Sequence, residues 1–406
     1  MSLHSLMFGW EYPPAHLGGL GVACQGIVRG LLQHGARVTL VLPHSAGEEA
    51  GVQILSPMSS VASGVSAIAV PSALQPYDGF ATYGARLQDF DLEDDGISQL
   101  YGQNLGEEVQ RFTDIAVQMT KHVNPDIIHT HDWMTLEAGV QASKHHRKPL
   151  VAHVHATELD RTEFHPNPWI FKREIMGLRK ADHVIAVSAY TRGLLMREYG
   201  ISGDKITVLH NGTFNAAPQA RTTGHKNARH PLVLFLGRLT VQKGASHFIE
   251  AARKVADRNP DARFVVAGEG YLLPQLIAHA CRLGLQDRII FAGRVTSTEA
   301  KKLYAKAECF VMPSVSEPFG LVALEAITHG APVVLSKQSG AAEVVHNGMQ
   351  VDFWDTDKMA DCILTVLREE PLRAEMRVQT PRILSNLTWA RQGKKIISIY
   401  DDIIRS

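Results

Sequence analysis

Two groups of residues have the chemistry to hold a phosphate. The run Gly18-Gly19-Leu20-Gly21 follows an expected strand, and glycines there let backbone N–H groups approach an anion at the start of the next helix. Arg238 and Lys243 lie five residues apart on an expected strand-to-helix loop. There a guanidinium would bind a diphosphate through two N–H groups, and an ammonium would act as a point charge. Each group alone also has a plainer interpretation, a tight turn for the glycines and solvated surface cations for the basic pair.

A third group is the segment 316–326, in which Glu317 and Glu325 flank the expected start of a helix near Gly320. Backbone N–H groups of residues 319–322 would point outward from that helix N-terminus, which suits a phosphate. Glu325 can accept hydrogen bonds from the two hydroxyls of a ribose, and Glu317 can do the same for a sugar ring. Two carboxylates beside a diphosphate repel it unless hydroxyl groups engage them. The segment therefore favours a sugar nucleotide over a simple phosphate ester, although Glu325 alone would also fit a helix-surface residue.

Four histidines form a further group at the ends of two expected strands. His129 and His131 precede Asp132 and Trp133, and His153 and His155 end the next strand along the chain. Period-two alternation places the members of each pair on one face. A zinc site, packing between sheet and helix, and hydrogen bonding to a sugar and its leaving group are the three interpretations. Besides these two histidine pairs, the sequence shows no cluster that would supply a further metal ligand. We therefore favour hydrogen bonding and expect no metal.

The elements that must position these residues follow from the pattern of the chain. Short β-branched runs alternate with helical stretches, which indicates βαβ units and parallel sheets. We predict an α/β protein with two Rossmann-like domains, 1–212 and 232–387, joined by a polar linker at 213–231. Parallel sheets bind ligands at the carboxyl ends of their strands, so the ligand is expected between the domains. The expected strands are 3–8, 37–42, 126–131, 150–155, 183–187, 206–210, 232–236, 262–267, 288–291, 309–312 and 332–335, and no function is assigned to 45–106.

Composition limits the class of protein. The chain has 406 residues, with 41 Lys+Arg against 41 Asp+Glu, and this balance lacks the basic excess of a nucleic-acid or membrane-surface binder. No apolar run approaches the ~18 residues that span a bilayer, and the first ten residues lack the features of a signal peptide. The four cysteines form no C-x-x-C pair, which fits a reducing compartment. We expect a cytoplasmic protein with neither nucleic acid nor membrane among its partners.

Together these motifs resemble those of the retaining GT-B glycosyltransferases of the GT4 group, in particular glycogen synthase-like and trehalose synthase-like glucosyltransferases. The shared motifs lie within residues 8–345 and are Trp10-Glu11-Tyr12-Pro13-Pro14 with the glycine run, His129-x-His131-Asp132-Trp133, Arg238-x4-Lys243 and Glu317-x7-Glu325. The resemblance implies a GT-B fold and transfer of glucose or a related hexose with retention of configuration, without metal or cofactor. It implies UDP-glucose or ADP-glucose as the donor and a carbohydrate, foremost an α-glucan, as the acceptor.

The resemblance also implies roles for individual residues. Arg238 and Lys243 would neutralise the donor diphosphate, and Glu317 would engage the transferred sugar. His155 would hydrogen-bond that sugar near its reacting carbon, and Asp132 would lie close to the acceptor. The final helix, 388–406, would pack back on the N-terminal domain. The implied donor-binding residues are Gly18, Gly19, Gly21, Val295, Phe319, Gly320, Leu321 and Glu325, the last on the ribose.

Two positions depart from the pattern of the family. His16 stands where bacterial glycogen synthases carry a lysine, and Ala341 replaces the second glycine of a G-G-x-x-E pattern that ends at Glu343. The resemblance therefore does not single out ADP-glucose or glycogen. The alternatives are a GT-B sugar-nucleotide epimerase or hydrolase, a trehalose- or sucrose-type disaccharide synthase, and a non-catalytic sugar-nucleotide-binding protein. An NAD oxidoreductase fits poorly, because the second expected strand ends in Leu42-Pro43-His44 with no acid for a ribose.

Overall fold

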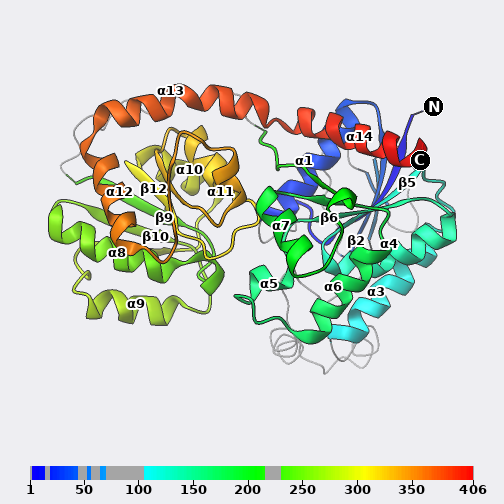
Figure 1. Cartoon of the computed structure of the whole chain (residues 1–406), viewed down its shortest axis with the longest axis horizontal. Helices are drawn as coiled ribbons and strands as arrows, with labels where there is room; N and C mark the ends of the chain where they lie inside the picture. Colours follow the sequence, from blue (N-terminus) through cyan, green and yellow to red (C-terminus); the bar gives the residue numbers. More distant parts are fainter. Residues whose placement is uncertain are drawn as a thin grey trace.

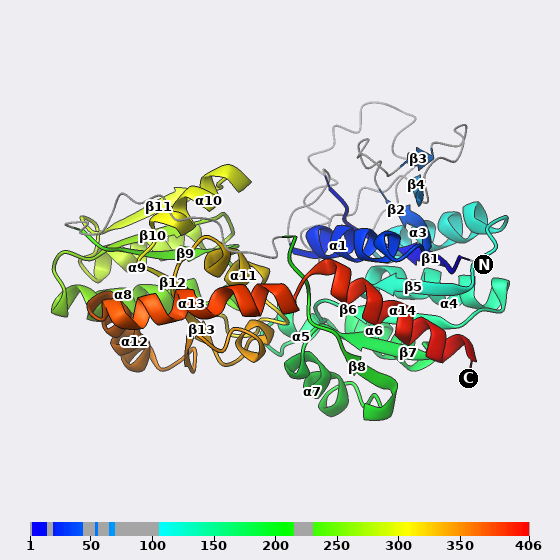
Figure 2. The same cartoon turned by 90° about the horizontal axis from the view of Figure 1, so that it is seen from above.

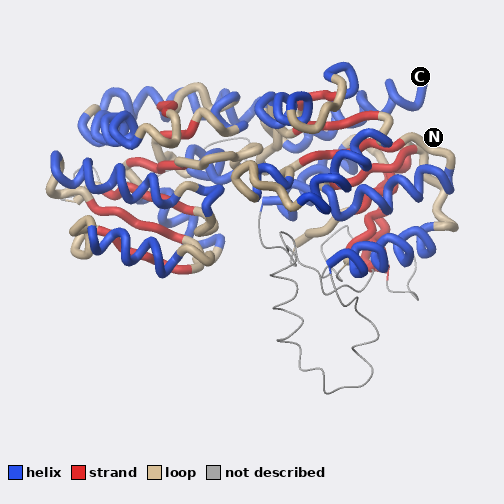
Figure 3. Tube along the Cα trace, turned by 60° about the horizontal axis from the view of Figure 1, so that its bottom comes forward, coloured by secondary structure: helices blue, strands red, loops and turns tan. Residues whose placement is uncertain are grey.

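The computed structural model describes residues 2–13, 19–43, 105–214 and 230–405, together with the backbone of 53–55 and 65–69. Figure 1 shows two α/β lobes side by side, each with a sheet between helices, and Figure 3 shows the strands of each lobe enclosed by helical layers. Within the described ranges, every helix is too short or too polar to span a bilayer.

The N-terminal lobe contains an eight-stranded sheet in the order β3-β4-β2-β1-β5-β6-β7-β8, with every neighbouring pair parallel. Apart from the edge strands β3 and β8, the order is that of a doubly wound Rossmann sheet. Its strands are β1 (His4–Phe8), β2 (Arg37–Leu42), β3 (Gln53–Leu55), β4 (Val65–Ala69), β5 (Ile127–His131), β6 (Leu150–Val154), β7 (His183–Ala186) and β8 (Ile206–Val208). Its helices are α1 (Gly19–Gln33), α3 (Leu105–Thr120), α4 (Trp133–His146), α5 (Glu158–Arg161), α6 (Pro168–Lys180) and α7 (Ala189–Arg197), followed by the 3-10 turn η1 (Gly203–Lys205).

The C-terminal lobe repeats the doubly wound arrangement with a six-stranded parallel sheet in the order β11-β10-β9-β12-β13-β14. The strands are β9 (Leu232–Leu236), β10 (Arg263–Ala267), β11 (Ile289–Gly293), β12 (Cys309–Met312), β13 (Val333–Ser336) and β14 (Met349–Val351). The helices are α8 (Ala245–Arg258), α9 (Leu273–Arg282), α10 (Ser297–Lys306), α11 (Leu321–Thr328), α12 (Thr356–Arg368) and α13 (Glu370–Asn386), with 3-10 turns η2 (Val241–Lys243) and η3 (Gly340–Glu343).

The last helix, α14 (Trp389–Arg405), leaves the C-terminal lobe and packs on the N-terminal one. Its apolar face places Trp389, Ile396 and Tyr400 in the N-terminal core, and it lies beside α1 (Figure 2). The contact is close, because a Cβ atom added to Gly393 would lie 2.3 Å from the backbone of Gly30. The chain therefore connects the two lobes once before β9 and again between α13 and α14.

The predicted fold class, two Rossmann-like domains with parallel sheets, is confirmed. All eleven expected strands are present, with ends that differ by up to two residues. The sequence did not predict β3, β4 or β14, nor the four-residue helix α5. The three strands lie at or next to a sheet edge, where a short run without strong alternation carries little signal. Of the expected linker, residues 215–229 lie outside the described residues.

Candidate functional site

A cleft lies between the carboxyl ends of the two sheets. One part, of about 820 Å³ with its open side included, is lined from both lobes, with Gly19 and His155 on one side and Lys243 and Glu317 on the other. A wider part of about 2090 Å³ continues along the C-terminal lobe and shares Gly19, Lys243 and Leu321 with the first. We call the two parts together the interdomain cleft. It has the position expected for a ligand site in paired doubly wound sheets.

Arg238 and Lys243 both line the cleft, in both of its parts. They lie on the loop between β9 and α8, which turns at Gly244. Gly244 has φ +70°, and a Cβ atom there would lie 2.0 Å from the carbonyl oxygen of Pro313, so only glycine fits this turn. The Lys243 ammonium lies 2.7 Å from a carboxylate oxygen of Glu317. The structure thus brings the predicted phosphate-binding cation and the predicted sugar-binding acid into direct contact.

The N-terminus of α11 opens into the same space. Gly320 precedes the helix with φ +100°, and a Cβ atom there would meet the Met312 side chain at 2.9 Å. Glycine has no side chain to cap the first N–H groups of the helix, and the helix dipole concentrates positive charge at this end. Phe319, Gly320 and Leu321 all line the cleft. The arrangement is that of a helix N-terminal anion site.

Glu325 lies one turn into α11 and faces the wider part of the cleft, which Val295 also lines. Its carboxylate accepts a hydrogen bond of 3.2 Å from the hydroxyl of Tyr304. The Glu325 side chain is exposed in the cleft. Its carboxylate can therefore accept hydrogen bonds from hydroxyl groups of a ligand in place of those from water.

The glycine run is only partly at the cleft. Gly18 lies outside the described residues, whereas Gly19 begins α1 and lines both parts of the cleft. The N–H group of Gly21 donates to the carboxylate of Glu11 at 2.9 Å, and Gly21 is not among the described residues that line the cleft. Because Glu11 is buried and already occupies this helix N-terminus, the Gly21 amide is not free to bind a phosphate. A role of Gly21 in donor binding stays a prediction.

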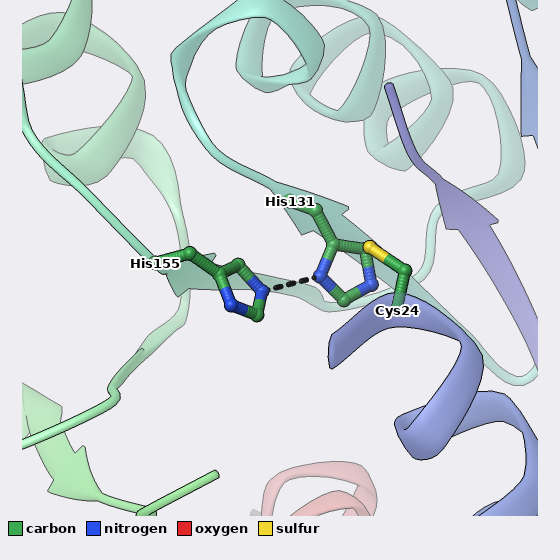
Figure 4. Close-up of side chains that lie close together, drawn as sticks. All are labelled: Cys24, His131 and His155. Carbon is green, nitrogen blue, oxygen red and sulfur yellow. Dashed lines mark hydrogen bonds between the residues drawn. The ribbon is translucent and has the colours of Figure 1, made fainter. Parts of the chain in front are cut away.

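The four histidines lie on one face of β5 and β6, and all of them are buried. His155, just after β6, lines the cleft, and its Nε2 lies 2.9 Å from Nδ1 of His131. Figure 4 shows His131 between His155 and Cys24 of α1. Burial lowers the pKa of His129 and of His155 to about 3. All four rings are therefore uncharged near neutral pH.

The ring planes bear on the zinc interpretation. His129 stacks on His131 and His153, and His153 stacks on His155, with interplanar angles of 29°, 2° and 17°. A metal ion must lie in the plane of each imidazole that binds it, and stacked rings direct their lone pairs into parallel planes. Nitrogens of His129, His131 and His153 lie within 4.8 Å of one another, and so do Sγ of Cys24 and nitrogens of His131 and His155, whose rings are inclined by 34°. The stacked rings of the first group favour hydrogen bonding over metal coordination, and independence from metal stays a prediction.

Asp132 stands at the start of α4 with φ +58°. Its carboxylate accepts the N–H groups of His155 at 2.6 Å and Ala156 at 3.2 Å. Burial raises the pKa of Asp132 to about 6. Asp132 therefore fixes the turn that carries His155, and it borders a small adjacent cavity rather than the cleft itself. Its contact with an acceptor stays a prediction.

Several residues of the cleft carried no role in the sequence analysis. Ser314 donates to Glu317 at 3.2 Å, and Asn211 and Gln242 line the cleft from either lobe. Asn211 belongs to the run His210-Asn211-Gly212, which ends the predicted N-terminal domain and was given no role in binding. A polar residue directly after an expected strand was the signal that would have identified it, since such positions face the carboxyl edge of the sheet.

Two family models match adjoining stretches of the chain. Residues 102–213 match Glycosyltransferase Family 4, and residues 218–382 match Glycosyl transferases group 1. Glycogen synthase of Mycobacterium tuberculosis is 27% identical over 408 residues, which cover 97% of this chain and 94% of that protein.

Solved structures show the same architecture. Sucrose-phosphate synthase of Thermosynechococcus elongatus aligns with a TM-score of 0.77 at 19% identity over 99% of both chains. The HepE protein of Anabaena in complex with UDP-glucose aligns with a TM-score of 0.70 at 19% identity, over 98% of this chain and 99% of that one. These likenesses show the fold, and the family models and the relative show the class. The chain belongs to the GT4-type glycosyltransferases and has the GT-B fold.

Proposed function

We propose that the protein transfers glucose, or a related hexose, from UDP-glucose or ADP-glucose to a carbohydrate acceptor with retention of configuration, with an α-glucan as the first acceptor to test. One observation carries this proposal: Arg238, Lys243 and the open N-terminus of α11 meet Glu317 and Glu325 in a single cleft. Cations and amides suit a diphosphate, and the carboxylates suit the hydroxyls on either side of it. The UDP-glucose complex of the HepE protein supports a donor of this class.

We propose one orientation of the donor in the cleft. The diphosphate lies between Arg238, Lys243 and the α11 N-terminus, the ribose hydroxyls donate to Glu325, and the sugar extends toward Glu317 and His155. Lys243 neutralises Glu317 before the donor arrives, so the ammonium can shift to the diphosphate while sugar hydroxyls take its place on the carboxylate. The neutral imidazole of His155 is suited to hydrogen bonding and adds no charge beside the sugar.

The proposed transfer then proceeds with the acceptor hydroxyl, the donor diphosphate and the cations that hold it. The bond between the sugar C1 and the diphosphate oxygen breaks, and the acceptor hydroxyl oxygen bonds to C1 on the same face. The acceptor proton passes to an oxygen of the departing diphosphate. Arg238 and Lys243 stabilise the charge that develops there, a contribution of about 3 kcal/mol for one well-placed donor in a closed site. Because these cations belong to the chain, the proposed reaction uses no metal ion or cofactor.

A panel of donors and acceptors tests the proposal. UDP-, ADP- and GDP-sugars are each incubated with glucose, glucose phosphate, malto-oligosaccharide and glycogen, and nucleotide release and product mass are followed. We expect release that depends on an acceptor, and an α-linked product by NMR. Release at the same rate without any acceptor would instead identify a hydrolase or epimerase, and a β-linked product would exclude retention.

A further inference from the structure

The 3-10 turn η3 (Gly340–Glu343) carries the G-G-x-x-E-like sequence noted above. It lies outside the cleft, and its last residue forms contacts between the two lobes. Glu343, at the end of η3 in the C-terminal lobe, accepts the N–H groups of Ala189 at 2.9 Å and of Tyr190 at 2.8 Å. These are the first N–H groups of α7 in the N-terminal lobe, which a helix leaves without partners of its own. Nε2 of His210 lies 2.7 Å from the same carboxylate. Three groups of one lobe thus converge on one carboxylate of the other.

A second set of contacts joins the lobes at the residue before Glu317. The hydroxyl of Ser316 donates to the carboxylate of Asp160 in α5 and lies 2.9 Å from the hydroxyl of Tyr190. Ser316 and Asp160 are both buried. The carbonyl of Pro318, directly after Glu317, accepts from Thr191 of α7 at 3.5 Å. Groups of the N-terminal lobe therefore hold the residues on both sides of the cleft glutamate.

The two sets of contacts are mechanically connected. The N–H group of Gly340, at the start of η3, donates to the carbonyl of Glu317 at 3.0 Å, and the N–H group of Ala341 donates to Phe319 at 2.6 Å. Gly340 also fits closely, because a Cβ atom there would lie 2.6 Å from Cβ of Ser188 and 2.3 Å from the carbonyl oxygen of Pro318. A displacement of α7 relative to η3 would thus be passed directly to the Glu317 loop.

We propose that Glu343, Asp160 and Ser316 form an interdomain clamp that sets Glu317 and the N-terminal lobe at the spacing needed for transfer. The inference rests on the proposed function of the cleft. The three are positioning residues, since Glu343 and Asp160 are not among the described residues that line the cleft and Ser316 turns its hydroxyl toward Asp160. Hydrogen bonds from His210 and the two amides outweigh the effect of burial and lower the pKa of Glu343. Glu343 is therefore charged near neutral pH.

The clamp predicts a separation of donor binding from turnover. The charged residues proposed to bind the nucleotide, Arg238, Lys243 and Glu325, lie in the C-terminal lobe, whereas Gly19 and His155 line the cleft from the N-terminal lobe. Loosening the clamp should leave the affinity for UDP nearly unchanged and slow the transfer step. A misplacement of about 1 Å can cost roughly 10²-fold in rate.

The test compares Glu343→Gln and Ser316→Ala with Glu198→Gln, which changes an exposed carboxylate at the opposite end of α7. We expect the first two to lower kcat by at least tenfold, with the Kd for UDP, measured by calorimetry, within about twofold of wild type. Hydrogen exchange at the α7 N-terminus should rise in Glu343→Gln alone among the three. Glu198→Gln should match wild type in every measurement.

The outcomes separate the clamp from the proposed function. Unchanged kcat in a folded Glu343→Gln protein, or a loss of UDP affinity as large as the loss of kcat, would overturn the clamp. If the wild-type protein bound no UDP, the proposed function would fail, and the clamp would still be judged by hydrogen exchange and by the radius of gyration from small-angle scattering. If hydrogen exchange at the α7 N-terminus and the radius of gyration were both unchanged in Glu343→Gln, the clamp would be overturned whether or not the proposed function holds.

Discussion

At the scale of single residues, Lys243 and Glu317 form an ion pair in the cleft. The two charges lie 2.7 Å apart, and the Glu317 side chain is only 8% exposed. Lys243→Ala is expected to lower turnover at least tenfold, because both the diphosphate and Glu317 lose their countercharge. Lys394→Ala, on the exposed side of α14, is the matched control. Steady-state rates with the active donor measure the effect, and a rate near wild type would remove Lys243 from the diphosphate site.

Glu325 is expected to affect binding rather than chemistry. Glu325 lines the wider part of the cleft. In the proposed donor arrangement it binds the ribose, whose hydrogen bonds should be the same in the ground state and the transition state. Glu325→Ala should therefore raise the donor KM about tenfold and change kcat little. Tyr304→Phe removes only the hydroxyl that donates to Glu325 and should have a smaller effect. A normal KM with a reduced kcat would place Glu325 at the reacting end of the donor instead.

At the scale of elements, the four buried histidines at the ends of β5 and β6 should make the free energy of unfolding depend on pH. Burial holds the pKa of His129 and His155 at about 3 and lowers that of His131 and His153. Below about pH 6.5 the unfolded chain binds protons that the folded chain does not. The free energy of unfolding should thus fall with decreasing pH by about 1.4 kcal/mol per unit for each buried histidine.

Urea unfolding at pH 7.0, 6.0 and 5.5 measures this dependence. Neither ring nitrogen of His153 has a hydrogen-bond partner among the described residues, so His153→Phe removes one titrating group without breaking a hydrogen bond. Its pH dependence should be shallower than that of wild type by about one proton. His165→Gln, at an exposed position, is the control. A slope equal to wild type in His153→Phe would mean that His153 is protonated in the folded protein.

The elements also show why sequence reasoning succeeds or fails at particular positions. The run Cys309–Met312 is a central strand with all four residues buried, and its apolar pattern predicted its bounds correctly. The strand Met349–Val351 has one buried residue and no alternation that would separate it from a loop. Lys243 and Glu317 were both identified by type and spacing, but their ion pair depends on Gly244 turning one loop toward another. The role of Glu11 at the α1 N-terminus depends on a contact across ten residues that no spacing rule contains.

At the scale of the whole molecule, α14 makes the last residues of the chain part of the N-terminal fold. Tyr400 hydrogen-bonds His129 beneath the histidine stack, and Trp389 packs against Gly26 and Gly212. The helix packs on the N-terminal lobe from its first residue, and α13 connects it to the C-terminal lobe, so this connection restricts how far the lobes can separate. The cleft, the proposed clamp and α14 therefore bear on one property, the distance between His155 and the proposed donor site in the C-terminal lobe.

Gly393→Val tests this dependence without touching the cleft. A Cβ atom at Gly393 would lie 2.3 Å from the Gly30 backbone, so the valine should push α14 away from α1 and cost about 1–3 kcal/mol of stability. Hydrogen exchange should increase in α1 and α14 while the C-terminal lobe stays protected. Binding of UDP should persist, because Arg238 and Lys243 are unaffected, whereas transfer should fall. Lys394→Ala, one position along the same helix, should change none of these. Loss of UDP binding with normal protection of α1 would show instead that the N-terminal lobe supplies the main hold on the nucleotide.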